Sequence, residues 1–313
     1  FEASVGGGIP VIKALREGLV GNNITSIYGI INGTANYILS EMSERGGRFE
    51  DVLASAQKLG YAEADPTYDV EGIDTAHKLA ILIDLAYGSY ISLDDIYTEG
   101  ITSINELDIG FAKEFGYEIK LLAIAKRYTG GRVEARVHPT MIPAGHPLAA
   151  VDGAFNAVFI RGDSVGPVML YGYGAGMMPT ASAVVADIAD IARNIKAGIT
   201  RRVPPLSCPD GEAKELEIKD MADLDIPYYL RFSAQDKPGV LSRISGVLGA
   251  HNISISSVLQ KDRKIGGAVP LVVTTHHAAE HELRSALGEI EELDVIDGRA
   301  VYIRIEENLG AAD

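Results

Sequence analysis

The sequence predicts an α+β protein, in which a larger domain with helices on one face of a mixed β-sheet precedes a ferredoxin-like βαββαβ domain. Three observations support this prediction. The chain has 313 residues, which is long enough for two separate cores. A proline-rich stretch divides it at residues 201–211. Before that stretch the predicted helices lie mostly near the front and the strands near the back, whereas after it the order is strand, helix, strand, strand, helix, strand.

The first domain is expected to cover residues 1–200, followed by a linker at 201–226. Helices collect near its front and strands near its back, an order typical of α+β proteins. The third helix should end at Gly60, and Pro10 suits the first position of the first helix. The predicted helices are 10–19, 36–45, 49–59 and 184–195, and the predicted strands are 24–31, 118–128, 132–142, 157–161 and 168–171.

The second domain is expected to cover residues 227–305. Its segments read as strand, helix, strand, strand, helix and strand, which is the order of the split βαβ unit. These segments are 228–232, 240–248, 253–260, 269–274, 279–288 and 295–305.

Composition narrows the class of protein. The net charge of −15 argues against nucleic acid and anionic membrane surfaces as partners, because both would be repelled. Cys208 is the lone cysteine, which suits a reducing cytoplasm. We find neither a signal peptide nor an apolar run near the roughly 20 residues of a membrane span. Phe1 begins a stretch typical of the middle of a domain, so we expect an amino-terminal part to precede it.

The most informative segment is residues 60–78, an acidic loop that leads into an apolar helix. Asp65 precedes a proline and Gly72 permits a further turn, so residues 61–73 should be an ordered loop. Asp74 is expected to be the N-cap of the next helix, and Lys78 lies one turn later on the same face. Such a pair is also typical of a plain surface salt bridge, and acidic loops are commonly solvated.

Three glycine-containing turns are further candidates. Residues 2–10 hold a triple glycine before a helix, which predicts either an anion cradle or a tight turn. At residues 30–37 the chain passes from strand to helix, with Thr34 as the expected N-cap, and a plain connection is the alternative. Residues 170–181 resemble a dinucleotide-binding turn but lack the acidic residue that should follow.

Residues 60–78 resemble the substrate loop of homoserine dehydrogenases, which reads Gly-Tyr-x-Glu-x-Asp-Pro followed by Asp, Gly, Asp and Lys at the same intervals. The resemblance implies reduction of aspartate 4-semialdehyde to homoserine with NADP or NAD, in the branch towards threonine, isoleucine and methionine. It also implies an amino-terminal nucleotide-binding domain that these residues do not contain, without which we expect the chain alone to be inactive.

The same resemblance implies roles for individual residues. Lys78 would give a proton to the substrate oxygen, and Asp74 would orient Lys78 and the substrate hydroxyl. The remaining substrate residues would be Glu63 and Asp69 at the ammonium group, with Gly33, Thr34 and Tyr61 nearby. Cofactor contacts would be Gly60, Glu63 and Gly176, and a sodium ion would be held by Glu2, Val5, Gly7 and Ile9.

Residues 236–241, Asp-Lys-Pro-Gly-Val-Leu, within the predicted split unit resemble an ACT domain. The resemblance implies a small amino acid as effector, with threonine expected, held by Asp236, Gly239, Val240 and Asn252. It also implies a homodimer or homotetramer, since ACT domains often pair edge to edge. The apolar face of the helix within 181–195 would pack towards the nucleotide domain, so we expect it to be either exposed in this chain or covered by a neighbour.

Two other functions remain open at this point. One is an amino-acid-sensing ACT protein whose front half is an oligomerisation scaffold, but a scaffold would need none of the residue types in the acidic loop. The other is a different ACT-regulated dehydrogenase of the same architecture, which the residues alone do not exclude.

Overall fold

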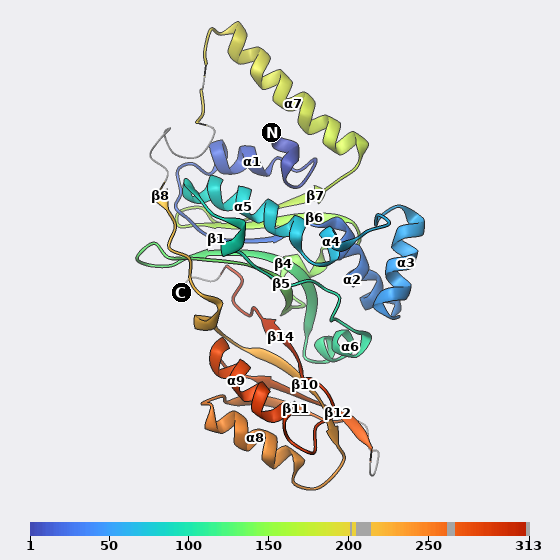
Figure 1. Cartoon of the computed structure of the whole chain (residues 1–313). Helices are drawn as coiled ribbons and strands as arrows, with labels where there is room; N and C mark the ends of the chain where they lie inside the picture. The colour runs from blue at the N-terminus through green and yellow to red at the C-terminus, as the bar shows by residue number, and fades with distance from the viewer. Residues whose placement is uncertain (201, 205–213, 262–266, 311–313) are drawn as a thin grey trace.

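The computed structural model describes residues 1–200, 202–204, 214–261 and 267–310, so Cys208 and much of the predicted linker lie outside the described residues. Within these ranges ten strands join one mixed sheet, in the order β11-β12-β10-β14-β5-β4-β1-β6-β7 with β3 beside β5. The sheet of the second domain therefore continues directly into that of the first (Figure 1). The predicted α+β class is confirmed.

The first domain contains both helices and strands along its whole length. The helices are α1 (Val11–Lys13), the π-helical η2 (Ala14–Gly18), α2 (Gly33–Arg45), α3 (Phe49–Leu59), α4 (Thr67–Val70), α5 (Ile73–Tyr87), α6 (Glu106–Glu114) and α7 (Met177–Lys196), with 3₁₀ turns η1 (Glu2–Ser4), η3 (Leu93–Asp95) and η4 (Pro147–Ala150). The strands are β1 (Ile24–Ile30), β2 (Ser89–Tyr90), β3 (Tyr97–Thr98), β4 (Tyr117–Arg127), β5 (Val133–Pro143), β6 (Phe155–Gly162) and β7 (Gly166–Tyr173).

The second half follows the predicted order of elements. It contains β8 (Lys214–Glu215), η5 (Met221–Asp223), β9 (Asp225–Ile226), β10 (Tyr228–Gln235), α8 (Val240–Ala250), β11 (Ile255–Leu259), β12 (Ala268–Thr275), β13 (Ala278–Ala279), α9 (Glu280–Glu291) and β14 (Val301–Ile305). The last strand begins six residues later than predicted, because the preceding residues turn away before β14 pairs with β10.

Two predicted helices differ in detail. The first is not a regular α-helix: the amide of Leu19 bonds the carbonyl of Ala14, five residues back, so the helix ends as a π-helical turn. The last begins at Met177 rather than at residue 184, because its first turn is exposed and carries no apolar periodicity that marks a helix. The apolar face of α7 is exposed as expected, at Val184, Val185, Ile188 and Ile191.

The sheet of the first domain is covered on both faces. On one face α2 and α5 pack over β1 and β4, and Ile27 and Leu121 point into this core. On the other face Tyr28 and Leu122 lie under η4 and the C-terminal Leu309. The alternation of side chains along each strand explains why consecutive residues of β1 enter different cores.

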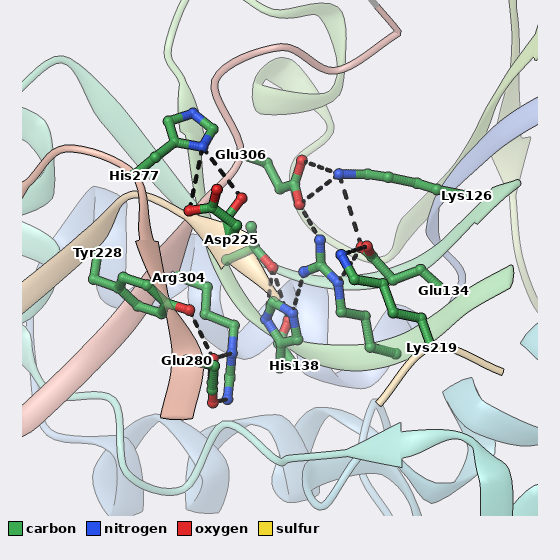
Figure 2. A network of polar contacts seen from close by, with 12 residues as sticks. Lys126, Glu134, His138, Lys219, Asp225, Tyr228, His277, Glu280, Arg304 and Glu306 are labelled. Atoms are coloured by element: carbon green, nitrogen blue, oxygen red, sulfur yellow. Dashed lines mark hydrogen bonds and ion pairs between the residues drawn. The ribbon is translucent and has the colours of Figure 1, made fainter. Parts of the chain in front are cut away.

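The two domains meet at a parallel pairing of β14 with β5, in which Arg304 lies opposite Thr140. Charged side chains line this joint (Figure 2). Arg136 is fully buried and bonds both Glu134 and Glu306, and Lys126 also contacts both carboxylates. Because Glu306 follows β14 while the other three come from β4 and β5, this cluster joins the domains.

The buried cluster has a defined protonation state. Burial opposes ionisation of Glu134, but the charges of Arg136 and Lys126 outweigh it and lower the pKa of this carboxyl to about 2. The pKa of Glu306 is lowered as well, for the same balance of burial against Arg136 and Lys126. Both carboxylates are therefore ionised in the folded protein at neutral pH.

The joint generates a prediction about stability. Glu134→Gln should lower the free energy of unfolding by about 3 kcal/mol at pH 7, because it leaves Arg136 with an incompletely compensated buried charge. The stabilisation by Glu134 is present above its unfolded pKa near 4.5 and is lost as the pH falls towards the folded value of about 2. The difference between wild type and variant should therefore shrink over that range in urea unfolding.

Glu217→Gln is the matched control, since its carboxylate is 75% exposed and lies 3.9 Å from Arg132. An exposed pair of this kind should cost less than about 1 kcal/mol. Equal losses in the two variants would contradict the structural role given to Glu134.

Candidate active site

The centre of the candidate site is Asn32, which follows β1 and precedes α2. Its side-chain oxygen accepts a hydrogen bond from the amide of Ala35 at 2.8 Å, so Asn32 is the N-cap of α2. Its side-chain nitrogen donates to Asp69 at 2.7 Å and to Asp74 at 2.9 Å. The prediction that Thr34 is the N-cap is wrong, because the Asn32 side chain already occupies that position.

The short helix α4 and the start of α5 supply the acidic groups. Asp65 accepts hydrogen bonds from the backbone and hydroxyl of Thr67, which starts α4 inside the predicted loop. The prediction that Asp74 is an N-cap is also wrong: Gly72, with a φ of 79°, precedes the helix and Asp74 lies in its first turn. This turn directs Asp74 towards Asn32 rather than back onto the backbone.

Lys78 lies at the focus of these groups. Its ammonium nitrogen is 2.7 Å from a carboxylate oxygen of Asp74 and 3.0 Å from the carbonyl of Ile31, and it donates to both. The predicted pairing of Asp74 with Lys78 across one helical turn is confirmed. The Lys78 side chain is 22% exposed and that of Asp74 28%, so both are partly open to a small ligand.

The other loop residues lie at the rim of this cluster. The Tyr61 ring stacks on Tyr37 at 4.4 Å, and Thr34 donates to the Tyr61 carbonyl. Glu63 is exposed, and Gln57 bonds its carbonyl. Gly33 lies against the carbonyl of Ala154, where an added Cβ would be 3.0 Å from that oxygen, so a side chain would crowd this turn. Gly60 ends α3 in the left-handed conformation.

Two glycine-rich segments pack against each other beyond this cluster. The amide of Gly8 bonds the carbonyl of Tyr173, and a Cβ on Gly7 would collide with the backbone of Gly174. Gly176, with a φ of 113°, precedes α7. This close backbone approach confirms the tight-turn reading of residues 2–10.

Glu2 has a structural contact of its own. Its carboxylate accepts hydrogen bonds from the amides of Ile12 and Lys13 at the start of α1, at 2.8 and 2.9 Å. Burial raises the pKa of Glu2, against the effect of these two bonds. Val5 and Ile9 are buried in the same segment. No group of three or more His, Cys, Asp or Glu side chains could hold a metal ion among the residues described.

The four predicted effector residues do not meet within the chain. Gly239 precedes α8 in the left-handed conformation, with Asp236 and Val240 beside it in sequence. Asn252, with a φ of 57°, follows the other end of the same helix. The helix has 11 residues, so these ends are about 16 Å apart. A single free amino acid is too small to contact both.

A cavity of about 640 Å³ lies away from this cluster. It is at the joint of the two domains, lined among others by Lys126, Arg161, Lys219 and Glu306. The cluster around Lys78 is the candidate active site, because a partly exposed ammonium group and two carboxylates converge there. In the cavity, by contrast, Lys126, Lys219 and Glu306 are engaged in ion pairs at the domain joint.

Sequence comparisons match most of the chain. The homoserine dehydrogenase family profile matches residues 10–189, and the ACT domain profile matches residues 228–295. The homoserine dehydrogenase of Neisseria gonorrhoeae is 49% identical over 98% of this chain and 70% of its own length. That of Pseudomonas aeruginosa is 48% identical over 98% of this chain and 71% of its own length.

Solved structures give the same result. A homoserine dehydrogenase from Thiobacillus denitrificans aligns with a TM-score of 0.91 and 48% identity, over 98% of this chain and 70% of its own. A hyperthermophilic archaeal homoserine dehydrogenase mutant in complex with NADPH aligns with a TM-score of 0.54 and 34% identity, over 62% of this chain and 55% of its own.

Asn32 is the residue that sequence reasoning missed as a functional group. Within residues 30–37 only Thr34 was expected to cap the helix, although an asparagine before a helix is also a strong capping signal. That its amide nitrogen also reaches two carboxylates 37 and 42 residues away depends on tertiary structure.

The site predicts a pH-dependent defect. Asn32→Asp keeps an oxygen for the Ala35 amide but places a third carboxylate beside Asp69 and Asp74. Repulsion among like charges raises the folded pKa of such carboxyls, so the defect is present at neutral pH and is relieved as the pH falls through the raised values. We expect a loss of about 1 to 3 kcal/mol in unfolding free energy at pH 7, with a smaller loss at pH 5.

Asn105→Asp is the control for this experiment. Asn105 caps α6 through Leu107 and Asp108 amides in the same way, with no bridge between two carboxylates. A loss at position 32 that does not depend on pH, or that equals the loss at position 105, would argue against the bridging role.

Proposed function

Because the chain belongs to the homoserine dehydrogenase family, we propose that Lys78 and the groups around Asn32 form the site where aspartate 4-semialdehyde and homoserine are interconverted. The enzyme is an NAD(P)-dependent oxidoreductase with an ACT domain. The observation that carries the proposed site is the convergence of Lys78, Asp74 and Asp69 through one asparagine. A purely sensing scaffold would not need this convergence.

We assign the proton transfer to Lys78. When hydride reaches the aldehyde carbon, the substrate oxygen becomes an alkoxide and needs a proton, which a lysine ammonium can donate. In the reverse direction the same nitrogen accepts the hydroxyl proton. Asp74 holds this nitrogen from one side and the Ile31 carbonyl from another, so the donor is already positioned.

We propose that the remaining carboxylates select the substrate by its ammonium group. Asp69 is half-buried and held by Asn32, whereas Glu63 is exposed at the rim. A fixed inner carboxylate and an exposed outer one suit a small zwitterionic substrate. Gly33, Thr34 and Tyr61 form the nearby wall, where the Thr34 hydroxyl ties the Tyr61 backbone in place.

The nicotinamide nucleotide supplies or takes up the hydride when it is bound. We propose Gly60, Glu63 and Gly176 as its contacts in this chain. Both glycines have positive φ angles and carry no side chain, which leaves backbone open to a closely approaching ligand. Met177 and Met178 next to Gly176 are 84% and 74% exposed, so this wall is open.

We propose a sodium ion at the segment of Glu2, Val5, Gly7 and Ile9. Hard monovalent cations require oxygen ligands, and this irregular, largely buried backbone can present carbonyl groups. The carboxylate of Glu2 accepts one amide hydrogen bond at each oxygen, which leaves each oxygen a further lone pair for a cation.

We propose threonine as the effector, bound at Asp236, Gly239 and Val240 before α8. Asn252 at the far end of α8 would contact the same molecule only from another subunit, which fits a homodimer or homotetramer. The outer edges of β11 and β7 have no partner strand in the described residues. Among those residues no helix is long and apolar enough to cross a membrane. The single cysteine supports a cytoplasmic location.

Replacing Lys78 by alanine should abolish most turnover in the full-length enzyme. The proton is needed mainly in the transition state, so kcat should fall by about 10²-fold or more while substrate binding changes little. Steady-state kinetics in both directions measure this. Lys113→Ala on α6 is the control. If the kcat of the Lys78 variant is within about threefold of the wild-type value, Lys78 is not the proton donor.

Threonine should raise the melting temperature of the protein, because a ligand that binds only the folded state stabilises it. Affinity should be modest, since a free amino acid has few atoms. Gly239→Asp places a carboxylate beside the proposed anion site and should abolish the shift. If the melting temperature of the wild type does not change at high millimolar threonine, threonine is not the effector. If it rises equally in wild type and Gly239→Asp, threonine binds at a different site.

A further inference from the structure

The ACT domain and the substrate carboxylates lie on opposite sides of one short segment, residues 97–102, here called the strap. The strap begins with β3, which pairs in parallel with β5 through Tyr97 and Thr98. It then leaves the sheet and runs against the turn between α4 and α5. It therefore contacts both the regulatory domain and the element that carries Asp69.

The first contact is with the ACT domain. Arg304 of β14 donates to the carboxylate of Glu99 at 2.8 Å and, through another nitrogen, to the Tyr97 hydroxyl at 3.1 Å. The Tyr97 hydroxyl in turn donates to Glu99 at 2.9 Å. Arg304 is 1% exposed and is also held by the buried Glu280 of α9. The strap is thus joined to two elements of the ACT domain through one guanidinium group.

The second contact is with the substrate side. The amide of Ile101 donates to the carbonyl of Val70, the last residue of α4, at 2.8 Å. A Cβ on Gly100 would collide with that carbonyl and would lie 2.6 Å from the Cα of Glu71. The strap therefore touches α4 backbone to backbone, one residue from Asp69.

The strap also supports the start of α5. A Cβ on Gly72 would lie 3.3 Å from the methyl group of Thr98 and 3.4 Å from the Glu99 carbonyl. Gly72 is the left-handed residue that separates α4 from α5, and so sets the spacing of Asp69 and Asp74. The whole α4–α5 corner is packed against the strap with little free space.

From these contacts we infer that the strap couples the ACT domain to the substrate site, with Glu99 and Gly100 as positioning residues for Asp69. The inference rests on the proposed function of Asp69. A change of the ACT domain that moves Arg304 moves the carboxylate of Glu99, and the close packing at Gly100 passes that movement to α4. Lys78 is held by the Ile31 carbonyl as well as by Asp74, so it keeps one contact that does not depend on the α4–α5 corner. The strap therefore acts on substrate affinity more than on proton transfer.

Two variants test the strap from different sides in the full-length enzyme. Glu99→Gln weakens the link to Arg304 without changing the shape of the side chain. Gly100→Ala leaves all charges intact but pushes α4 away from the strap. Each should raise the KM for homoserine by roughly threefold to tenfold with kcat within about twofold, the size of effect expected for coupling residues that touch no ligand. Homoserine titration should show the same loss of affinity.

Two matched controls accompany these variants. Gly288→Ala in α9 makes the same replacement where nothing lies within 4 Å. Arg243→Met breaks an exposed ion pair with Asp294 elsewhere in the ACT domain and leaves the Arg304 contact with Glu99. Neither should change the KM. Circular dichroism confirms that each variant is folded before kinetics are measured.

Asp69→Asn tests the substrate role of Asp69 separately from the coupling role of the strap. If it leaves homoserine affinity unchanged, the substrate role proposed for Asp69 fails. If it weakens affinity while folded Glu99→Gln and Gly100→Ala bind homoserine as wild type does, the coupling role of the strap is rejected. An equal loss in the Gly288→Ala control would likewise reject it, because the effect would not be specific to the strap.

Discussion

The pairing of buried charges where β14 meets β5 is the constraint on which the arrangement of the two domains depends. Arg136 and Arg304 are almost fully buried, and each is compensated by carboxylates from the other side of the joint: Glu306 for Arg136 and Glu99 for Arg304. A buried guanidinium without such partners would be costly, so sliding β14 along β5 is strongly disfavoured. The register of one parallel strand pair thereby determines how the regulatory domain is placed over the strap and the α4–α5 corner.

Local signals explain why much of the fold was predictable. Gly60 ends α3 as expected, because a left-handed glycine is the common way to stop a helix. The two long antiparallel strands were predicted nearly in full, because β4 contains the apolar run 121–125 and β5 alternates apolar residues with Glu134, Arg136 and His138. The order of elements in the ACT domain was predictable because the spacing of apolar residues changes between the strand and the helix pattern along the local sequence.

What was missed depends on contacts between distant residues. The joining of the two sheets by β14 and β5 was not predicted, because the local sequence does not show which carboxylates compensate the charges of Arg136 and Arg304. The caps at Asn32 and Gly72 were assigned to neighbouring residues, because several polar or flexible residues stand close together and tertiary packing selects among them. The pairing of Asp74 with Lys78 was predictable, since it spans one turn of a single helix, whereas its link to Asp69 was not.

The amide of Asn32 has a consequence for how the site meets its substrate. Its NH₂ group donates hydrogen bonds to the carboxylates of Asp69 and Asp74, and its oxygen accepts one from the first turn of α2. Together these three hydrogen bonds fix the orientation of the amide. An amide turned the other way would set oxygen against oxygen and nitrogen against nitrogen. The distance between Asp69 and Asp74 is therefore set by the residue that caps α2, before any ligand binds. Such preorganisation spares the substrate the entropic cost of ordering its own binding site.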